Sequence, residues 1–382
     1  MTANHHLVVS IIVPARNEEA CLGTCLESLI AQTGIALEII VVDDDSTDRT
    51  AEIARSFRGA HGIEAGPLPD NWTGKNNAMA AGAKIAKGKW LLFTDADTVH
   101  KPGSLARAVA EAEQHGAALL SYSPEQEVRG FWEKAVMPVI FAELAATYPP
   151  AKVNDPASPI AAANGQYLMI SREAYDAVGG HTKIASDLLE DVALARLVKR
   201  SGRKIFFRYG ADAVRTRMYR SWAQMKKGWT KNLALLFSPT WGIACWRLAE
   251  FLAIPFLFIG TVIFAVIGGL NLAFQPALLA IFVFVFFWGR IRAAHFSIPS
   301  SLLAVLGLPV FGYLLLRSAR LQRLGTVGWK DRTYPASRGA AVASTGFNVA
   351  GAVILFLAIQ IPFFLAGIVI LETYGDKIFH HH

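Results

Sequence analysis

The chain has 382 residues, a net charge of +7 and an apolar content of 53%, enough for one large domain with a smaller appendage. The apolar residues gather toward the C-terminus, and residues 251–289 contain no Asp, Glu, Lys, Arg or His. This distribution excludes a wholly soluble chain and predicts a polar domain followed by a membrane domain. The spacing of the three cysteines matches no metal-binding or disulfide pattern, so we expect them to be free thiols.

Short apolar strands alternate with helical patterns over the first half of the chain. We expect strands at 7–13, 37–42, 90–94 and 161–170. We expect helices at 19–31, 47–57, 103–115 and 186–201. A loop rich in Pro, Ala, Asn and Asp is expected at 148–160. The alternation predicts an α/β domain with a mainly parallel sheet.

Acidic clusters follow two of these strands. Asp43 and Asp44 come after the second strand, and Asp95 and Asp97 after the third. Ligands of parallel sheets bind beyond the carboxyl ends of the strands, where these side chains are expected to lie. Two carboxylates on one turn suit Mg²⁺ or Mn²⁺, which prefer oxygen ligands and share them with phosphate or water.

Each short motif also has an ordinary structural interpretation. The pair Asp95 and Asp97 is typical of a solvated turn, and the acidic run 43–48 is typical of a helix cap. The segment 72–78, which includes Lys75, suits an anion or a base edge but equally an ordinary helix start. Glu190 and Asp191 would look the same as a surface pair at a helix start.

The order of these motifs is more specific than any one of them. Five motifs follow one another along residues 7–235: Val13–Glu18, Asp43–Asp48, Gly74–Lys75, Asp95–Asp97 and Glu190–Asp191. Read together, they resemble the family 2 glycosyltransferases, which have a Rossmann-like GT-A fold.

The resemblance implies roles for individual residues. Asp191 would be the general base of an inverting displacement, and Asp97 with Asp95 would hold the metal. The nucleotide-binding residues would be Pro14, Ala15, Arg16, Glu18, Asp43, Asp44, Lys75 and Asp95.

One further family motif departs from its usual form. Processive and lipid-directed members carry Gln-x-x-Arg-Trp near the membrane, whereas this chain has Gln224 followed by Lys226, Lys227, an inserted glycine and Trp229. We place these four residues, with Glu190, on the side of the site that binds the acceptor or the diphosphate. The same residues are also typical of a belt of Trp and Lys at a membrane surface.

A narrower resemblance is to the hopene-associated and ceramide or carotenoid glucosyltransferase-like branches. It rests on the segments 67–75 and 329–334. Such members usually begin with a membrane helix, which this sequence lacks.

The C-terminal part is expected to enter the membrane. We divide the chain into a catalytic domain at 1–235, an interfacial connection at 236–247 and a membrane domain at 248–375. Membrane spans are expected at 248–270, 273–289 and 345–371. Basic residues flank 296–316 on both sides, so this stretch either re-enters the membrane or spans it, and we favour the first.

Together with these features, the resemblance implies a metal-dependent, inverting glycosyltransferase. It would move a sugar from a nucleotide-sugar, which we expect to be UDP-linked, to a membrane lipid, with Mg²⁺ or Mn²⁺ as cofactor. The basic clusters adjoin membrane segments and the N-terminus lacks a signal-peptide pattern, so we expect the cell membrane, with the catalytic domain on the cytosolic face, and no nucleic-acid partner. The alternatives are a processive polysaccharide synthase and a catalytically silent nucleotide-binding adaptor.

Overall fold

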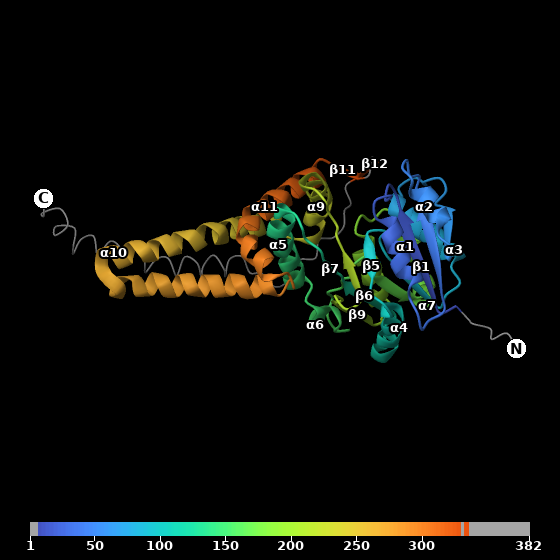
Figure 1. Ribbon diagram of the computed structural model, residues 1–382, viewed down its shortest axis with the longest axis horizontal. Coiled ribbons are helices and arrows are strands. Elements are labelled where there is room, and N and C mark those ends of the chain that lie inside the picture. Colours follow the sequence, from blue (N-terminus) through green and yellow to red (C-terminus); the bar gives the residue numbers. More distant parts are fainter. Residues whose placement is uncertain (1–6, 330–331, 336–382) are drawn as a thin grey trace, which may run out of the picture.

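The computed structural model describes residues 7–329 and 332–335. An α/β domain with a seven-stranded sheet lies at one end of the molecule, and a long helical hairpin projects from the other (Figure 1). The order of the sheet is β3-β2-β1-β4-β8-β6-β9. Its strands are β1 (Val9–Ala15), β2 (Leu37–Asp43), β3 (Ala60–Glu64), β4 (Trp90–Phe93), β6 (Leu119–Ser123), β8 (Leu168–Ser171) and β9 (Ile205–Tyr209).

The sheet is mainly parallel, as the sequence predicts. Only β8 runs antiparallel to its neighbours β4 and β6. The register places Ala15 of β1 beside Asp43 of β2, so both strands end at the same edge. A small second sheet next to this edge has the order β5-β10-β7, with β5 (Thr98–His100), β7 (Glu125–Gln126) and β10 (Val214–Thr216).

Helices cover both faces of the large sheet. Alternate residues of β1 point to opposite sides: Ile11 packs in a core with α1 (Leu22–Ile30) and α4 (Ser104–His115), whereas Ile12 packs in a core with α3 (Gly74–Ile85). The remaining helices of this domain are α2 (Thr50–Ser56), α6 (Pro150–Val153), α7 (Arg172–Ala177) and α8 (Glu190–Arg200), with a 3₁₀ helix η1 (Gly180–Ile184). The predicted mainly parallel, Rossmann-like fold is confirmed.

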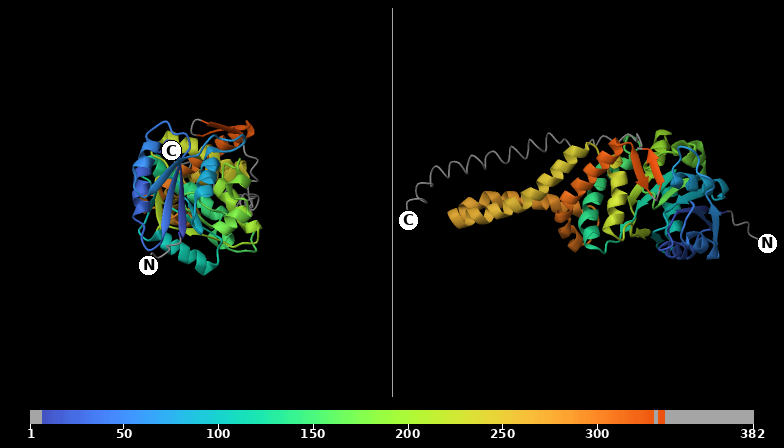
Figure 2. Two further views of the ribbon diagram at one scale, coloured as in Figure 1. Left: turned by 90° about the vertical axis from the view of Figure 1, so that its right-hand side faces the viewer. Right: turned by 90° about the horizontal axis from the view of Figure 1, so that it is seen from above.

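Three longer helices join this domain to the hairpin. These are α5 (Phe131–Thr147), α9 (Trp222–Leu236) and α11 (Ile298–Arg323). α11 packs against both α5 and α9, and half of its apolar span is buried. Two views show α5 and α11 lying across the base of the hairpin, between it and the sheet (Figures 1 and 2).

The hairpin itself is α10 (Thr240–Arg292), which runs out and back as two arms. The arms Thr240–Ile267 and Ala273–Arg292, together with α11, are long and apolar enough to cross a membrane. α10 begins at Thr240, so only three residues separate it from α9 in the region where we expected a connection at 236–247. The span expected at 345–371 lies outside the described residues.

An ionic ring fixes the base of the hairpin to α5. Arg247 and Arg290, one on each arm, both contact Glu143 of α5, at 2.7 and 2.8 Å. Both also contact Glu250, at 2.6 and 2.8 Å. All four side chains are buried or nearly so, and their charges cancel. We call Glu143, Arg247, Glu250 and Arg290 the ionic ring.

Candidate active site

The turn after β4 carries Asp95 and Asp97, and its backbone carbonyls accept hydrogen bonds from buried hydroxyl groups. Thr98 donates a hydrogen bond to the carbonyl of Asp95 at 2.8 Å, and Thr216 donates to the carbonyl of Asp97 at 3.2 Å. These bonds fix the backbone and leave both carboxylates directed into a cleft. The turn is therefore an organised part of the site rather than a solvated loop.

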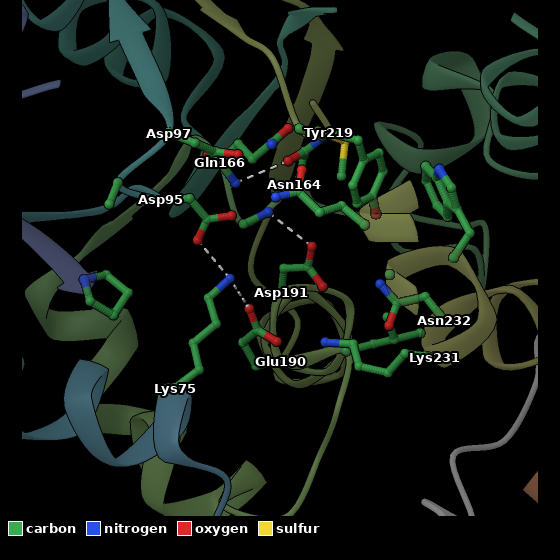
Figure 3. A pocket seen from close by; sticks show the side chains of 18 of the residues that line it. Lys75, Asp95, Asp97, Asn164, Gln166, Glu190, Asp191, Tyr219, Lys231 and Asn232 are labelled. Atoms are coloured by element: carbon green, nitrogen blue, oxygen red, sulfur yellow. Dashed lines mark hydrogen bonds and ion pairs between the residues drawn. The ribbon is translucent and has the colours of Figure 1, made fainter. Parts of the chain in front are cut away.

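Lys75, in the first turn of α3, joins two acidic residues that are far apart in the sequence. Its ammonium lies 2.7 Å from Asp95 Oδ1 and 2.7 Å from Glu190 Oε1 (Figure 3). Burial alone would lower the pKa of Lys75, but the carboxylates of Asp95 and Glu190 outweigh it and raise this pKa well above its ordinary value. Lys75 thus stays charged and ties the end of β4 to the start of α8.

Asp191 lies beside this bridge at the start of α8. Its Oδ2 accepts a hydrogen bond from the backbone N–H of Gly165 at 2.8 Å, and its Oδ1 accepts one from Val192 at 2.7 Å. Burial, followed by the nearby negative charge of Glu190, raises the pKa of Asp191 to about 6. A carboxylate with such a pKa is mostly ionised at neutral pH and is a stronger base than an ordinary aspartate.

These side chains meet in a cleft of about 550 Å³. Most of the predicted site residues line it: Pro14, Ala15, Arg16, Glu18, Asp44, Lys75, Asp95, Asp97, Glu190, Asp191, Gln224, Lys227 and Trp229. Two others do not appear among its lining residues. Asp43 is buried at the end of β2, where its Oδ2 accepts from the N–H of Ser46, and Lys226 lies on a different side of α9.

Trp229 forms a wall of the cleft and not its mouth. Its side chain is buried, and its indole N–H points to the sulfur of Met137 on α5 at 3.4 Å. The exposed residues of the lining are instead Ala20, Arg220, Gln224 and Lys227. Phe141 and Leu144 of α5 extend the apolar wall beside Trp229.

Two site residues on α9 were not anticipated. Lys231 and Asn232 line the cleft, and Lys231 points toward Glu190 and Asp191 (Figure 3). Burial lowers the pKa of Lys231 to about 8. The sequence signal was present, because Gln224, Lys227 and Lys231 are spaced to lie on one side of a helix.

A C-terminal β-hairpin also reaches the end of the cleft that Asp44 lines. It consists of β11 (Thr326–Trp329) and β12 (Arg332–Pro335) and follows directly after α11. Arg332 Nη1 lies 2.6 Å from Asp44 Oδ2, and the hydroxyl of Tyr334 accepts a hydrogen bond from the N–H of Gly74 at 3.3 Å. The sequence indicates this segment only through the narrower family resemblance and does not predict its contact with Asp44.

The donor set at the turn fits a hard divalent cation. Asp95 and Asp97 offer carboxylate oxygens into a cleft large enough for a ligand. Within residues 7–329 and 332–335, no cluster of three or more His, Cys, Asp or Glu side chains is placed to hold a metal. Any cation here would therefore take most of its ligands from phosphate and water, as magnesium sites usually do.

A protein-family comparison identifies the first part of the chain. Residues 10–179 match the model described as Glycosyl transferase family 2. The chain is similar to the 4,4'-diaponeurosporenoate glycosyltransferase of Staphylococcus aureus, with 27% identity over 87% of this chain and 90% of that protein. The protein of the same name from Staphylococcus haemolyticus is 31% identical over 61% of this chain and 62% of its own.

The chain is also similar to proteins of solved structure. The mannosyltransferase PcManGT from Pyrobaculum calidifontis, in complex with GDP-Man and Mn²⁺, is 18% identical over 83% of this chain and 87% of its own, with a TM-score of 0.45. Glucosyl-3-phosphoglycerate synthase from Mycobacterium tuberculosis, with Mn²⁺ and UDP-glucose, is 18% identical over 60% of this chain and 77% of its own, with a TM-score of 0.40.

Proposed function

The chain is a membrane-associated family 2 glycosyltransferase that uses a nucleotide-sugar, and from this premise we propose an inverting transfer from a UDP-sugar to a membrane lipid. One observation carries the proposal. Asp191, whose pKa is raised to about 6, lines the same cleft as Asp95, whose carboxylate pairs with Lys75. One cleft thus offers both a base for the acceptor and a site for the diphosphate.

The reaction needs one proton acceptor and one stabilised leaving group. The acceptor hydroxyl attacks the anomeric carbon as the bond from that carbon to the diphosphate oxygen breaks, and the hydroxyl proton passes to Asp191. Attack from the side opposite the leaving group inverts the anomeric configuration. Lys75 remains charged beside Asp95, where negative charge on the diphosphate increases during the reaction.

A divalent cation is the expected cofactor. Asp97, aided by Asp95, would hold it, and when bound it neutralises charge on the diphosphate. Both carboxylates line the cleft, which supports this assignment. Of the residues expected to bind the nucleotide, all but Asp43 line the cleft: Pro14, Ala15, Arg16, Glu18, Asp44, Lys75 and Asp95.

A lipid acceptor is supported by the walls of the cleft. Phe141, Leu144 and Trp229 make one side apolar, and they belong to helices that lie at the base of the hairpin. The staphylococcal relatives are named for transfer to 4,4'-diaponeurosporenoate, an acceptor that fits a lipid-directed enzyme. Basic residues around the apolar helices favour the cytosolic face of the cell membrane for the catalytic domain.

One assay tests both the identity of the sugar donor and the role of Asp191 as the base. Purified protein in lipid nanodiscs is given a panel of UDP- and GDP-sugars with a lipid extract, with and without Mg²⁺ or Mn²⁺. We expect a glycolipid from a UDP-sugar in the presence of metal. Asp191→Asn should lose transfer by about 10²-fold or more while still binding UDP, because only the proton acceptor is removed. Undiminished transfer by this variant would overturn the assignment of the base.

A further inference from the structure

An aromatic cluster with two exposed rings and a half-buried one, Trp222, lies where α5 and α9 begin. Phe131 and Trp132, in the first turn of α5, are 50% and 41% exposed. Their rings lie 5.1 Å apart, and the ring of Trp132 lies 5.3 Å from that of Trp222 in the first turn of α9. Large aromatic side chains rarely stay in contact with water as a group unless they meet a partner.

Basic residues adjoin this cluster. Arg220 and Lys227 are exposed and Lys226 is half-buried, and all three lie within five residues of Trp222. We call Phe131, Trp132, Trp222, Arg220, Lys226 and Lys227 the aromatic–basic surface. Trp with Lys or Arg is the combination found where proteins meet the headgroup layer of a membrane.

The position of α5 connects this surface with the membrane helices. Glu143, three turns after Trp132 on the same helix, belongs to the ionic ring at the base of both arms of α10. Figure 1 shows α5 lying across the base of this hairpin. A bilayer around the hairpin would therefore have its headgroup layer at the level of α5.

The mouth of the cleft adjoins the same surface. Three of the four exposed residues that line the cleft, Arg220, Gln224 and Lys227, lie on the segment that carries Trp222. Behind them the wall is apolar, with Phe141 and Leu144 on α5. A ligand that leaves the headgroup layer at Trp222 would pass these residues on its way to Asp191.

We propose that the aromatic–basic surface rests on the headgroup layer of an anionic bilayer and that the acceptor reaches the cleft across it. Phe131, Trp132 and Trp222 would lie among the headgroups, and the basic residues would bind lipid phosphates. The contact with the bilayer is argued from exposure, charge and the position of α5, and does not depend on the reaction. The second half rests on the proposed transfer to a lipid.

The first experiment tests the contact with the bilayer. In a Cys245→Ala background, a polarity-sensitive fluorophore is attached at Trp132→Cys or, as control, at Glu113→Cys, on the exposed end of α4. The full chain is placed in nanodiscs with or without anionic lipid and headgroup-depth quenchers. We expect quenching at 132, stronger with anionic lipid, and none at 113. A label at 132 that stays in water, or that is equally shielded in detergent without lipid, would overturn the surface.

The second experiment tests acceptor access. Phe131→Ser/Trp132→Ser should raise KM for a bilayer-embedded acceptor by about tenfold, because two aromatic side chains no longer meet the membrane. Hydrolysis of the donor without acceptor should not change. The matched control is Ile85→Ser, which alters an exposed apolar residue on α3, outside the aromatic–basic surface. An unchanged KM in the double variant would overturn the access route.

These two readouts separate the proposals. A wild-type protein that turns over no nucleotide-sugar at all would contradict the proposed function. The quenching measurement would still decide whether the aromatic–basic surface meets the bilayer.

Discussion

Arg332 pairs with Asp44 at 2.6 Å, although 288 residues separate them in the sequence. The pair is largely sheltered from solvent, and Arg332 also approaches Asp45 at 3.6 Å. The C-terminal hairpin thereby compensates acidic charge at the end of β2, where the anionic nucleotide is predicted to bind. We therefore expect this distant arginine to favour donor binding.

The first prediction concerns this arginine. Arg332→Ala leaves the carboxylates of Asp44 and Asp45 without this counter-charge, so UDP should bind about tenfold more weakly. Arg332→Lys should recover only part of the loss, since lysine lacks the planar fork of arginine. Calorimetric titration with UDP measures this, with Arg200→Ala, an exposed change on α8, as control. Unchanged UDP affinity in Arg332→Ala would show that the pair is purely structural.

A second prediction uses the lack of space at Gly74. A Cβ added there would lie 2.1 Å from both Arg332 Nη1 and Asp44 Oδ2. Gly74→Ala should therefore push the β11–β12 hairpin away from Asp44 and weaken UDP binding, as Arg332→Ala does. In the Gly74→Ala/Arg332→Ala double variant the two effects should not add, because they break the same contact. Additive losses of affinity would mean that Gly74 acts independently of the hairpin.

A third prediction concerns pH. Because the raised pKa of Asp191 is about 6, kcat/KM should rise with pH through about 6 as this base loses its proton. The positive charge of Lys75 lowers the pKa of Asp191. Lys75→Gln should therefore move this acidic limb to higher pH, besides reducing activity. A pH–rate profile of both proteins measures the shift, and an acidic limb that moves to lower pH would contradict the assignment.

Metal removal gives the fourth prediction. Chelation should stop transfer, and Mn²⁺ or Mg²⁺ should restore it, because the two carboxylates of the turn suit such ions. Asp97→Asn should need a higher metal concentration for half-maximal activity, whereas Asp43→Asn, at a buried carboxylate outside the cleft, should not. Equal metal requirements in these two variants would remove Asp97 from the metal site.

The sequence predicts β1, β2, β4 and β8 of the large sheet because their signals are local, whereas β3, β6 and β9 were not predicted. β2, which ends at Asp43, and β4, which ends at Phe93, are short and β-branched or apolar, and both lie in the sheet where expected. The ordered acidic motifs then predict which edge carries the site. Glu190 and Asp95 meet through Lys75 as a consequence of that fold.

The parts that were missed depend on packing between distant segments. α5 is buried on several sides and contains Pro138, so its sequence shows no clear amphipathic period. Lys231 lies in a stretch whose positive charge we assigned to the membrane surface, and only the packing of α9 turns it into the cleft. The contact of Arg332 with Asp44 depends on the path of the whole chain through α10 and α11.

The ionic ring gives the last prediction. Arg290→Leu would leave the buried carboxylates of Glu143 and Glu250 with only Arg247, at a cost of about 3–5 kcal/mol of stability. Glu143→Leu/Arg290→Leu keeps the charges balanced and should be less harmful than Arg290→Leu alone. Thermal unfolding in nanodiscs measures the difference.

The matched control for the ring is an exposed ion pair. Arg203 and Glu173 lie 3.5 Å apart with the Glu173 side chain 87% exposed, so Arg203→Leu should cost less than about 1 kcal/mol. If Arg290→Leu is no more harmful than Arg203→Leu, the ring does not hold the hairpin to α5. If it is much more harmful and the double variant recovers, balanced buried charge holds the base of α10 to α5.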